Sequence, residues 1–418
     1  MINYKNGNLT VESVDVSKIV SEVGTPFYCY SYNKILDQYR GLAAALSSSK
    51  ISIYFAVKAN SNLSIIKALA KEGAGADVVS LGEFKRCLIA GVDPKKIVFS
   101  GVGKTTEEIV EALNNDIFQI NVESEAELIN INEIAKSLGK VATIGLRVNP
   151  DVDAKTHEKI TTGKKENKFG IDLKDAPIFF SKASTLSNVS MKSLAVHIGS
   201  QLLELSPYKS AYEKIAEMTR YLRSTGHEIS HLDLGGGLGI PYSDESLADL
   251  NAYNQIILET VGDLDCKLSI EPGRYLVGEA GILITRVIYI KQGEQKKFVI
   301  VDGAMNDLIR PTLYDGFHAI VPVTEKNLSS QKSLCDVVGP ICESGDYFAK
   351  DRMLPEVSQN DLLAITCSGA YGAVMASNYN SRPLIPEVLV SNDVFSVIRE
   401  RQAFEKIIQD EKLAAWLQ

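Results

Sequence analysis

Several polar residues of this sequence follow short apolar runs, at positions where they could do chemistry. Lys58 ends the run YFAVK, and apolar neighbours lower the pKa of a lysine amine, which makes it a better nucleophile. His197 and Ser200 close the run LAVHIGS, and Glu271 and Arg274 stand in EPGR. Each residue alone has a simpler interpretation as a surface lysine, a structural histidine or an ion-pairing group. Together they offer an amine, an imidazole, a hydroxyl and a carboxylate for Schiff-base chemistry.

A glycine cluster, LGGGLGI, follows another apolar run and could hold an anion. Gly235, Gly236 and Gly237 let the backbone approach a ligand closely and point N–H groups at a phosphate. A tight turn is the simpler interpretation. An amine for an aldehyde, donors for a phosphate and an acid for a ring nitrogen are what pyridoxal phosphate requires. A cofactor-free aldolase acting on a sugar phosphate is the alternative, although it would not obviously need Glu271.

These residues stand at the ends of eight strand-like runs that alternate with helix-like stretches. The runs are rich in β-branched residues and end in Gly, Asn or Ser: 52–60, 75–80, 96–101, 117–122, 142–149, 194–200, 231–237 and 267–273. Strands that are apolar on both faces and alternate with helices indicate a parallel (β/α)₈ barrel. Chemistry in such barrels gathers at the carboxyl ends of the strands.

After residue 276 the pattern changes to short strands separated by turns, such as ILITRVIYIK, KKFVIVDG, LCDVVGP, DLLAITCS and PEVLVSN. This predicts a mostly antiparallel β-barrel or sandwich domain. The strand-like LTVESV near the start could pair with it. We therefore predict a barrel domain over 27–276 and a discontinuous β domain over 1–26 and 277–418.

The amino-acid composition limits the classes of molecule that this protein is expected to bind. The 418 residues are 45% hydrophobic and 23% charged, with a net charge of −8, which is typical of a globular enzyme without a surface for nucleic acid or anionic membrane. Six cysteines without a CxxC pair indicate reduced thiols in the cytoplasm and no zinc ribbon. We expect no metal, no signal peptide and no membrane span. The charged run 164–168 is predicted to be a solvated loop.

Ten strings, in this order, resemble the meso-diaminopimelate decarboxylase family, in the alanine-racemase-like barrel class of pyridoxal-phosphate enzymes. They are YFAVKAN, GADVVSLGE, RVNP, KFG, HIGSQ, LDLGGGLGI, EPGR, VDGAMNDLIRPTLY, VGPICESGD and GAYGAVMASNYNSRP. Each string alone is a weak signal, but ten in order are specific. The resemblance implies decarboxylation of meso-2,6-diaminopimelate to L-lysine and carbon dioxide, the last step of lysine biosynthesis.

The resemblance also implies how the cofactor is held. It implies that Lys58 forms the Schiff base with the cofactor, that His197 stacks on the ring, and that Glu271 pairs with the pyridine nitrogen. The residues implied to hold the phosphate or line its pocket are Ser200, Gly235, Gly236, Gly237, Gly273, Arg274 and Tyr371.

For the substrate, the resemblance implies one set of residues that bind carboxylates, namely Arg274, Arg310 and Tyr314. Glu343 would receive the distal ammonium, with Tyr371 nearby, and Cys342 would return a proton to the substrate carbon. In this family, Cys342 and Glu343 would reach the active site of the other subunit of a homodimer. Arg310 could instead be a surface charge and Cys342 a structural thiol.

Related enzymes share part of this pattern. Ornithine, arginine and lysine decarboxylases share the lysine, the glycine loop and the EPGR-like strand, so Arg310 with Glu343 must distinguish a substrate with a second carboxylate and ammonium. Alanine racemase tends to place arginine at the ring nitrogen, where Glu271 is expected here. A catalytically dead homologue is a further alternative. Other polar residues at strand ends either orient the first set or form structural salt bridges: Asp77, Ser80 and Arg147.

Overall fold

A computed structural model describes residues 2–153 and 168–417, and the chain forms two compact units. The barrel unit comprises Leu36–Pro241 and Glu245–Leu276, and the β unit comprises Met1–Ile35, Tyr242–Asp244 and Val277–Gln418. The predicted charged loop at 164–168 lies, except for Lys168, outside the described residues.

The barrel unit is a closed ring of parallel strands. Among the described residues, eight strands pair in the order β5-β6-β7-β8-β9-β11-β12-β13, and β13 pairs back with β5. Their bounds are Ser52–Ala56, Gly75–Val78, Ile97–Phe99, Gln119–Val122, Ala142–Asn149, Val189–Val196, His231–Asp233 and Lys267–Ile270, and a short strand β10 (Ile171–Asp172) pairs with β9. The predicted (β/α)₈ barrel is confirmed.

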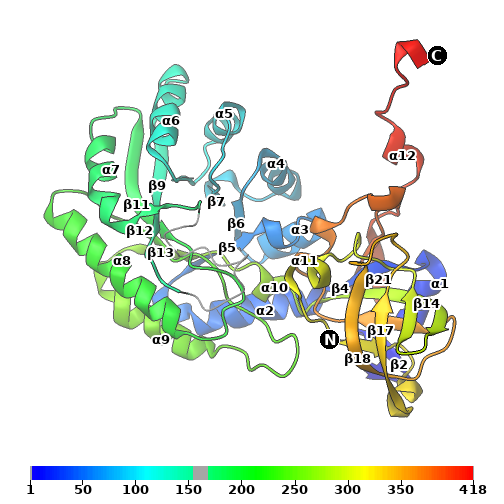
Figure 1. The fold of residues 1–418 in the computed structure, drawn as a ribbon. Helices are drawn as coiled ribbons and strands as arrows, with labels where there is room; N and C mark the ends of the chain where they lie inside the picture. Colours follow the sequence, from blue (N-terminus) through cyan, green and yellow to red (C-terminus); the bar gives the residue numbers. More distant parts are fainter. Residues whose placement is uncertain (1, 154–167, 418) are drawn as a thin grey trace. The chain divides into compact units, whose positions relative to one another are not determined.

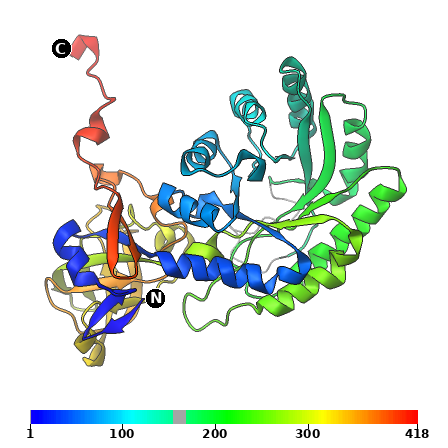
Figure 2. The same cartoon turned by 180° about the vertical axis from the view of Figure 1, so that it is seen from behind.

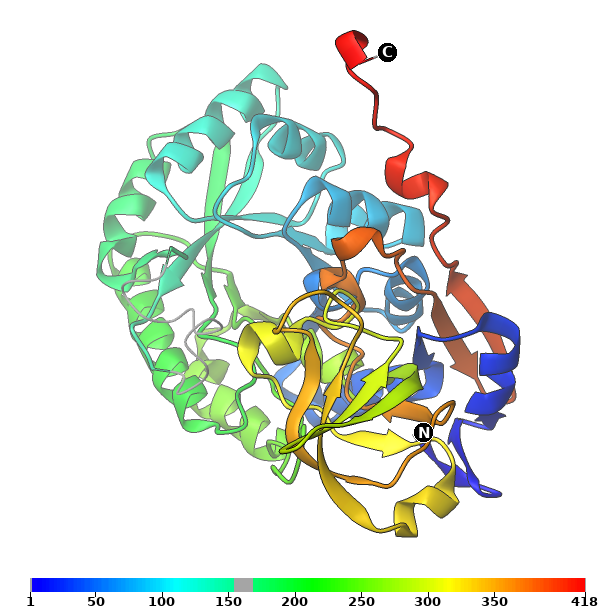
Figure 3. The same ribbon diagram turned by 45° about the vertical axis from the view of Figure 1, so that its right-hand side comes forward.

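Helices connect these strands and surround the ring (Figures 1 and 3). Several of them begin after a side-chain cap, such as Ser80 before α4 and Thr105 before α5, and the cap accepts from an N–H group that lacks a partner within the helix. The bounds are α2 Tyr32–Ala45, α3 Leu63–Lys71, α4 Leu81–Ala90, α5 Thr106–Asn114, α6 Glu125–Ser137, α7 Ala176–Ala183, α8 Ser206–Ser224, α9 Leu250–Val261 and α10 Arg274–Val277.

The β unit combines segments from both ends of the chain (Figure 2). Strands β1, β2 and β3 form a small antiparallel sheet, and the other strands form a larger, mostly antiparallel sheet. Its strands run in the order β18-β17-β15-β14-β4-β20-β21, and β19 pairs with β14 and β16. The sequence boundary at 27 differs from the structure, which keeps β4 in this unit because β4 pairs with β14 and β20. The bounds are β1 Ile2–Lys5, β2 Asn8–Val11, β3 Val14–Asp15, α1 Val16–Val23, β4 Phe27–Ser31, β14 Gly281–Gln292, β15 Lys297–Val301, α11 Arg310–Tyr314, β16 Ile320–Pro322, β17 Lys332–Val338, β18 Tyr347–Pro355, β19 Leu362–Ile365, β20 Glu387–Ser391, β21 Val394–Arg399 and α12 Glu405–Ile408.

Polar side chains form a hydrogen-bonded network among the barrel strands, centred on His231. Gln119 Nε2 donates to Asn121 Oδ1 (2.7 Å), so Gln119 Oε1 faces His231 Nδ1 (3.2 Å), and Ser269 Oγ lies 2.9 Å from His231 Nε2. These contacts fit a neutral imidazole with its proton on Nδ1. Burial, and then the charge of Lys267, lowers the pKa of His231 to about 4.

The wild-type protein is therefore expected to lose stability as the pH falls from about 6.5 to about 4. In this range the unfolded chain binds a proton at His231 that the folded protein does not accept, so the free energy of unfolding decreases with decreasing pH. His231→Gln should show a smaller loss. Thermal unfolding of both proteins between pH 7 and pH 4 checks this, and parallel curves would contradict it.

Candidate active site

The predicted nucleophile lies beside a buried carboxylate. Lys58 follows β5 in a short 3₁₀ turn, and its Nζ lies 3.6 Å from Oδ2 of Asp77, on β6. The Lys58 side chain is 37% exposed, whereas that of Asp77 is 1% exposed. The described residues give neither Asp77 oxygen a hydrogen-bond partner, so the ion pair offsets the cost of burying this charge.

His197 follows β11 and contacts the glycine loop. Gly236 N donates to His197 Nδ1 at 3.1 Å, which leaves the imidazole proton on Nε2. Burial, with the positive charges of Lys58 and Arg147, holds the pKa of His197 well below its usual value. The imidazole is therefore a neutral, oriented ring, as stacking on an aromatic cofactor requires.

The glycine loop follows β12 and packs closely on the neighbouring strand ends. Gly235 N donates to Asp233 Oδ1 at 3.0 Å, so the N–H groups of Gly235 and Gly236 both have acceptors within the protein. A Cβ atom on Gly236 would lie 2.2 Å from Glu271 O, which is why only glycine fits there. The described residues provide no acceptor for the N–H groups of Gly237 and Gly273.

Arg274 follows Gly273 in the loop after β13, and Ser200 lies in the loop after β11. Arg274 Nη2 donates to Ser200 Oγ at 3.2 Å, and Arg274 is 6% exposed. A guanidinium, a hydroxyl and N–H groups without acceptors are the donors that a phosphate group needs. The predicted phosphate site therefore has Gly237 and Gly273 as backbone donors, while Gly235 and Gly236 shape the loop.

Glu271 follows β13 and is buried next to a second carboxyl group, that of Asp233. The described residues give Glu271 Oε1 no hydrogen-bond partner. Burial, then the negative charges of Asp233 and Asp77, raises the pKa of Glu271 well above its usual value. Burial raises the pKa of Asp233 as well, but Asp233 accepts hydrogen bonds from Gly235 N and Asn121 Nδ2, which favour its charged form. Glu271 is thus the group that keeps a proton.

These features fit pyridoxal phosphate. The barrel unit offers an amine at Lys58, a neutral ring at His197, an acid at Glu271 with a buried oxygen that lacks a partner, and donors for a phosphate. Each of these groups follows a strand of the same parallel barrel, as expected for a barrel active site.

The predicted substrate arginine is firmly held in the β unit. Arg310 begins α11 and is 7% exposed. Its Nη1 lies 2.7 Å from His318 Nε2, and His318 Nδ1 lies 2.8 Å from Thr366 O. Because an arginine only donates and a carbonyl only accepts, His318 carries its proton on Nδ1. The guanidinium carbon also lies 4.4 Å from the centre of the Tyr242 ring, so Arg310 is not a surface charge.

Cys342 and Glu343 lie on an exposed loop of the β unit between β17 and β18. Asp346 fixes this loop from inside, because its buried carboxylate accepts from Ile341 N (2.6 Å) and Met305 N (2.7 Å). Cys342 N donates to Asn380 Oδ1 at 2.9 Å. The thiol and the Glu343 carboxylate are thus presented outward, so Cys342 is not a buried structural thiol.

Two tyrosines complete the predicted set. Tyr314 is half-buried at the last residue of α11. Tyr371 has a φ of 55°, a left-handed conformation that costs a residue with a Cβ atom free energy and that concentrates at functional sites. The predicted set is therefore divided: the cofactor residues except Tyr371 belong to the barrel unit, and the substrate residues except Arg274 belong to the β unit.

The structure adds residues that the sequence did not single out. Asp233 accepts a hydrogen bond from the glycine loop and its charge raises the pKa of Glu271, and its position two residues before GGG was a usable signal. His318 and Tyr242 hold Arg310, but nothing in the sequence near Arg310 points to them. Tyr379, in MASNYNSRP, has its pKa raised by a hydrogen bond to Glu343 and by the charge of Glu343.

The other polar residues at strand ends have identifiable partners. Arg147 Nη1 lies 3.2 Å from Glu123 Oε1, which is the salt bridge considered as its alternative. Ser80 Oγ accepts from Glu83 N at 3.2 Å and caps α4. Asp77 pairs with Lys58 and therefore is the one of the three that touches the predicted site.

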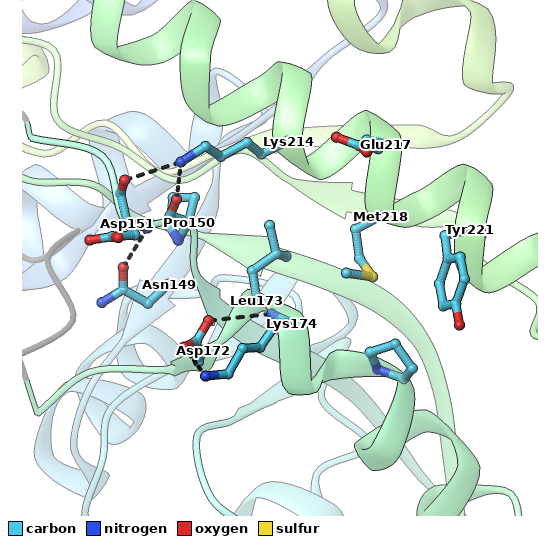
Figure 4. A pocket seen from close by; sticks show the side chains of 11 residues that line it. Asn149, Pro150, Asp151, Asp172, Leu173, Lys174, Lys214, Glu217, Met218 and Tyr221 are labelled. Atoms are coloured by element: carbon cyan, nitrogen blue, oxygen red, sulfur yellow. Dashed lines mark hydrogen bonds and ion pairs between the residues drawn. The ribbon is translucent and has the colours of Figure 1, made fainter.

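A cavity of about 600 Å³ lies elsewhere on the barrel unit, between the ends of β9 and β10 and helices α7 and α8 (Figure 4). Lys214 Nζ donates to Pro150 O (2.6 Å) and Asp151 O (3.1 Å), and Lys174 pairs with Asp172 at 3.2 Å. None of the predicted site residues lines this cavity, so it is separate from the arrangement described above.

Within residues 2–153 and 168–417, no helix combines the length and apolar character needed to cross a bilayer. The same residues contain no group of three or more His, Cys, Asp or Glu side chains placed to hold a metal ion.

Comparisons with known proteins agree with this geometry. Residues 32–278 match the family model for the pyridoxal binding domain of pyridoxal-dependent decarboxylases. The chain is 46% identical to the diaminopimelate decarboxylase of Zymomonas mobilis, with 99% of each protein covered. It resembles the crystal structure of Helicobacter pylori diaminopimelate decarboxylase complexed with L-lysine, with a TM-score of 0.91, 46% identity and coverage of 94% and 98%.

The diaminopimelate decarboxylase of M. jannaschii in co-complex with L-lysine gives a TM-score of 0.95 at 38% identity, with 100% of this chain and 99% of that chain covered. These matches extend over both units and confirm the predicted fold class and cofactor. The chain therefore belongs to the diaminopimelate decarboxylase family of pyridoxal-phosphate-dependent carboxy-lyases.

Proposed function

We propose that this protein removes one carboxylate from meso-2,6-diaminopimelate, giving L-lysine and carbon dioxide in the last step of lysine biosynthesis. The observation that carries the proposal is the similarity over nearly the full length of both proteins to diaminopimelate decarboxylases, two of which bind L-lysine in their crystal structures. The held guanidinium of Arg310 and the outward Glu343 supply the two charges that a second amino-acid centre needs.

The barrel unit supplies the cofactor contacts in this proposal. When bound, pyridoxal phosphate supplies an aldehyde for an amine and a conjugated ring that accepts the electron pair of the breaking bond. Lys58 provides the amine, and Asp77 at 3.6 Å keeps it at the mouth of the barrel. His197 covers the ring, and Glu271 holds a proton for its nitrogen. Arg274, whose Nη2 donates to Ser200, holds the phosphate.

The β unit supplies the substrate contacts. Arg310 binds a carboxylate through its planar guanidinium, and His318 and Tyr242 fix its orientation. In this proposal Tyr314 binds the same carboxylate, Glu343 receives the distal ammonium, and Tyr371 lies near Glu343. The Cys342 thiol donates its proton to the carbon that has lost the carboxylate, because its loop presents it outward.

Carbon dioxide release from four amino acids tests the proposal. The purified protein, loaded with pyridoxal phosphate, is given meso-diaminopimelate, L-lysine, L-ornithine or L-arginine separately. We expect release from meso-diaminopimelate alone, because the second carboxylate pairs with Arg310. Preferential release from ornithine, arginine or lysine would reject the proposed substrate while keeping the cofactor chemistry.

We further propose a cytoplasmic homodimer in which each active site takes Cys342 and Glu343 from the other subunit. Two observations support this: both residues lie on an exposed loop, away from the core of their own unit, and all six cysteines are free thiols. A residue that serves the other subunit must be presented outward in this way.

Mixing two inactive variants is expected to restore activity if the site is shared. Lys58→Ala lacks the amine and Cys342→Ala lacks the proton donor, so a mixed dimer contains one site with both native residues. In dimers purified through both tags, the recovered activity should approach half of the wild-type value, because each such dimer has one intact site of two. Activity is measured after joint refolding of differently tagged chains and purification through both tags.

The control is a mixture of Lys58→Ala with Lys58→Arg, in which no combination restores the amine. Absence of activity in verified Lys58→Ala and Cys342→Ala mixed dimers would show that both residues act within one chain.

A further inference from the structure

A pair of buried carboxyl groups, Asp233 and Glu271, lies at the ends of the neighbouring strands β12 and β13. The strands are in register at this point, since Asp233 pairs with Ser269 and Glu271 N donates to Gly235 O at 2.8 Å. Asp233 is 2% exposed and Glu271 is 8% exposed. Burial, then the negative charge of Asp233, raises the pKa of Glu271 well above its usual value, so the two neighbouring buried carboxyl groups retain a proton between them.

The two groups are anchored differently. Asp233 Oδ1 accepts from Gly235 N at 3.0 Å, and Asp233 Oδ2 lies 3.4 Å from Asn121 Nδ2. Asn121 is itself held by Gln119 Nε2 at 2.7 Å. Glu271, in contrast, has a buried oxygen with no partner among the described residues. Asp233 is therefore the fixed, charged member, and Glu271 is the member with an oxygen available to a ligand.

The charged groups around Asp233 and Glu271 also favour a state in which the pair keeps one proton. Lys58 brings one positive charge, which its ion pair with Asp77 already uses, so Asp77, Asp233 and Glu271 would carry two uncompensated negative charges if all were ionised. Like charges in a low-dielectric interior strongly disfavour this state. The titratable groups that face the pair from neighbouring elements are Asp77 on β6, Lys58 after β5, Tyr54 on β5, Tyr212 on α8 and Tyr253 on α9.

We infer that Asp233 is a positioning residue that acts through Glu271: its anchored carboxylate shares one proton with the Glu271 carboxyl, so that the cofactor's ring nitrogen meets an acid that already carries a proton. This inference rests on the proposed role of Glu271. If Glu271 gave this proton to the ring nitrogen, the O–H bond of its carboxyl would break and an N–H bond would form. The pair would then carry two negative charges, one of which the positive ring would compensate. Through Gly235, the same carboxylate also fixes the start of the glycine loop.

Asp233→Asn tests the inference, because asparagine keeps an oxygen for Gly235 N–H but cannot share the charge. The readout is the infrared carbonyl band of a protonated carboxyl in cofactor-free protein, assigned to Glu271 by its loss in Glu271→Gln. In the wild type we expect this band at neutral pH. In Asp233→Asn its midpoint should move to lower pH by about one unit or more, since a neighbouring negative charge is removed while burial remains. A midpoint equal to that of the wild type would overturn the inference.

Ser193→Ala is the matched control. Ser193 is 2% exposed in the same barrel interior, and its Oγ lies 3.1 Å from His231 Nδ1, so its loss disturbs the network without removing a carboxylate. Its midpoint should equal that of the wild type, and a shift as large as that of Asp233→Asn would overturn the inference by showing a general packing effect.

If Asp233→Asn does not fold, the same infrared measurement is made on Asn121→Ser. Removing a donor to Asp233 Oδ2 weakens its charged form, so the pair should hold its proton to a higher pH, and an unchanged midpoint would overturn the inference. The measurement uses protein without cofactor or substrate. Failure of the proposed decarboxylation would therefore leave the infrared result intact, and the two failures can be told apart.

Discussion

Lys58→Arg protein is expected to fold and remain inactive, with carbon dioxide release reduced at least about a thousandfold. The guanidinium keeps a positive charge beside Asp77, whose oxygens have no hydrogen-bond partner among the described residues. It cannot act as an amine nucleophile, because its pKa exceeds about 12. The variant should also lack the visible absorbance of covalently bound cofactor, which a spectrum of the loaded protein records.

Lys58→Ala removes both the positive charge and the amine, so its comparison with Lys58→Arg separates the effects of the two. It should be as inactive as Lys58→Arg but less stable, since it leaves the buried Asp77 carboxylate without its ion pair. Lys214→Ala serves as the control, because this lysine of the barrel unit donates to Pro150 O and Asp151 O instead. Wild-type absorbance and turnover in either Lys58 variant would remove the cofactor role of this lysine.

The strand ends of the barrel could be predicted from the sequence because both the strands and their order are local properties. A β-branched run followed by Gly, Asn or Ser marks the end of a parallel strand, and the closed topology then brings all such ends to one mouth. Lys58, His197 and Glu271 were identified in this way. Asp77 was identified only as a residue that could orient this set or form a salt bridge, and Asp233 was not identified. Both lie on other strands and meet Lys58 and Glu271 only in the folded barrel.

In the β unit the sequence was less informative. Strand β18, YFAKDRMLP, carries three charged residues in its middle and lies at the edge of the sheet, so an apolar-run search passes over it. The side chains that hold Arg310 also could not be predicted from local sequence patterns. His318 and Tyr242 reach it from another loop and from a segment that interrupts the barrel sequence. Only long-range packing brings these three side chains together.

Glu271→Gln is expected to lose activity and gain stability at the same time. The amide fills the same space but has no acidic proton for the ring nitrogen, so turnover should fall by about a hundredfold or more. Cofactor loading should persist, because Lys58 and the phosphate donors are unchanged. Steady-state kinetics and the absorbance of the loaded protein measure the two effects, and wild-type turnover would remove Glu271 from the proposed chemistry.

The gain in stability follows from the direction of the pKa shift. Burial and the charges of Asp233 and Asp77 raise the pKa of Glu271 well above its usual value, so the folded protein holds a proton that the unfolded chain releases above about pH 4.3. The wild type therefore loses stability as the pH rises toward the folded pKa, whereas the glutamine variant has no such loss. In cofactor-free protein, the difference in melting temperature should favour Glu271→Gln more at pH 8 than at pH 5. A constant difference would mean that Glu271 ionises normally, and the native residue would then be kept for a reason other than its proton.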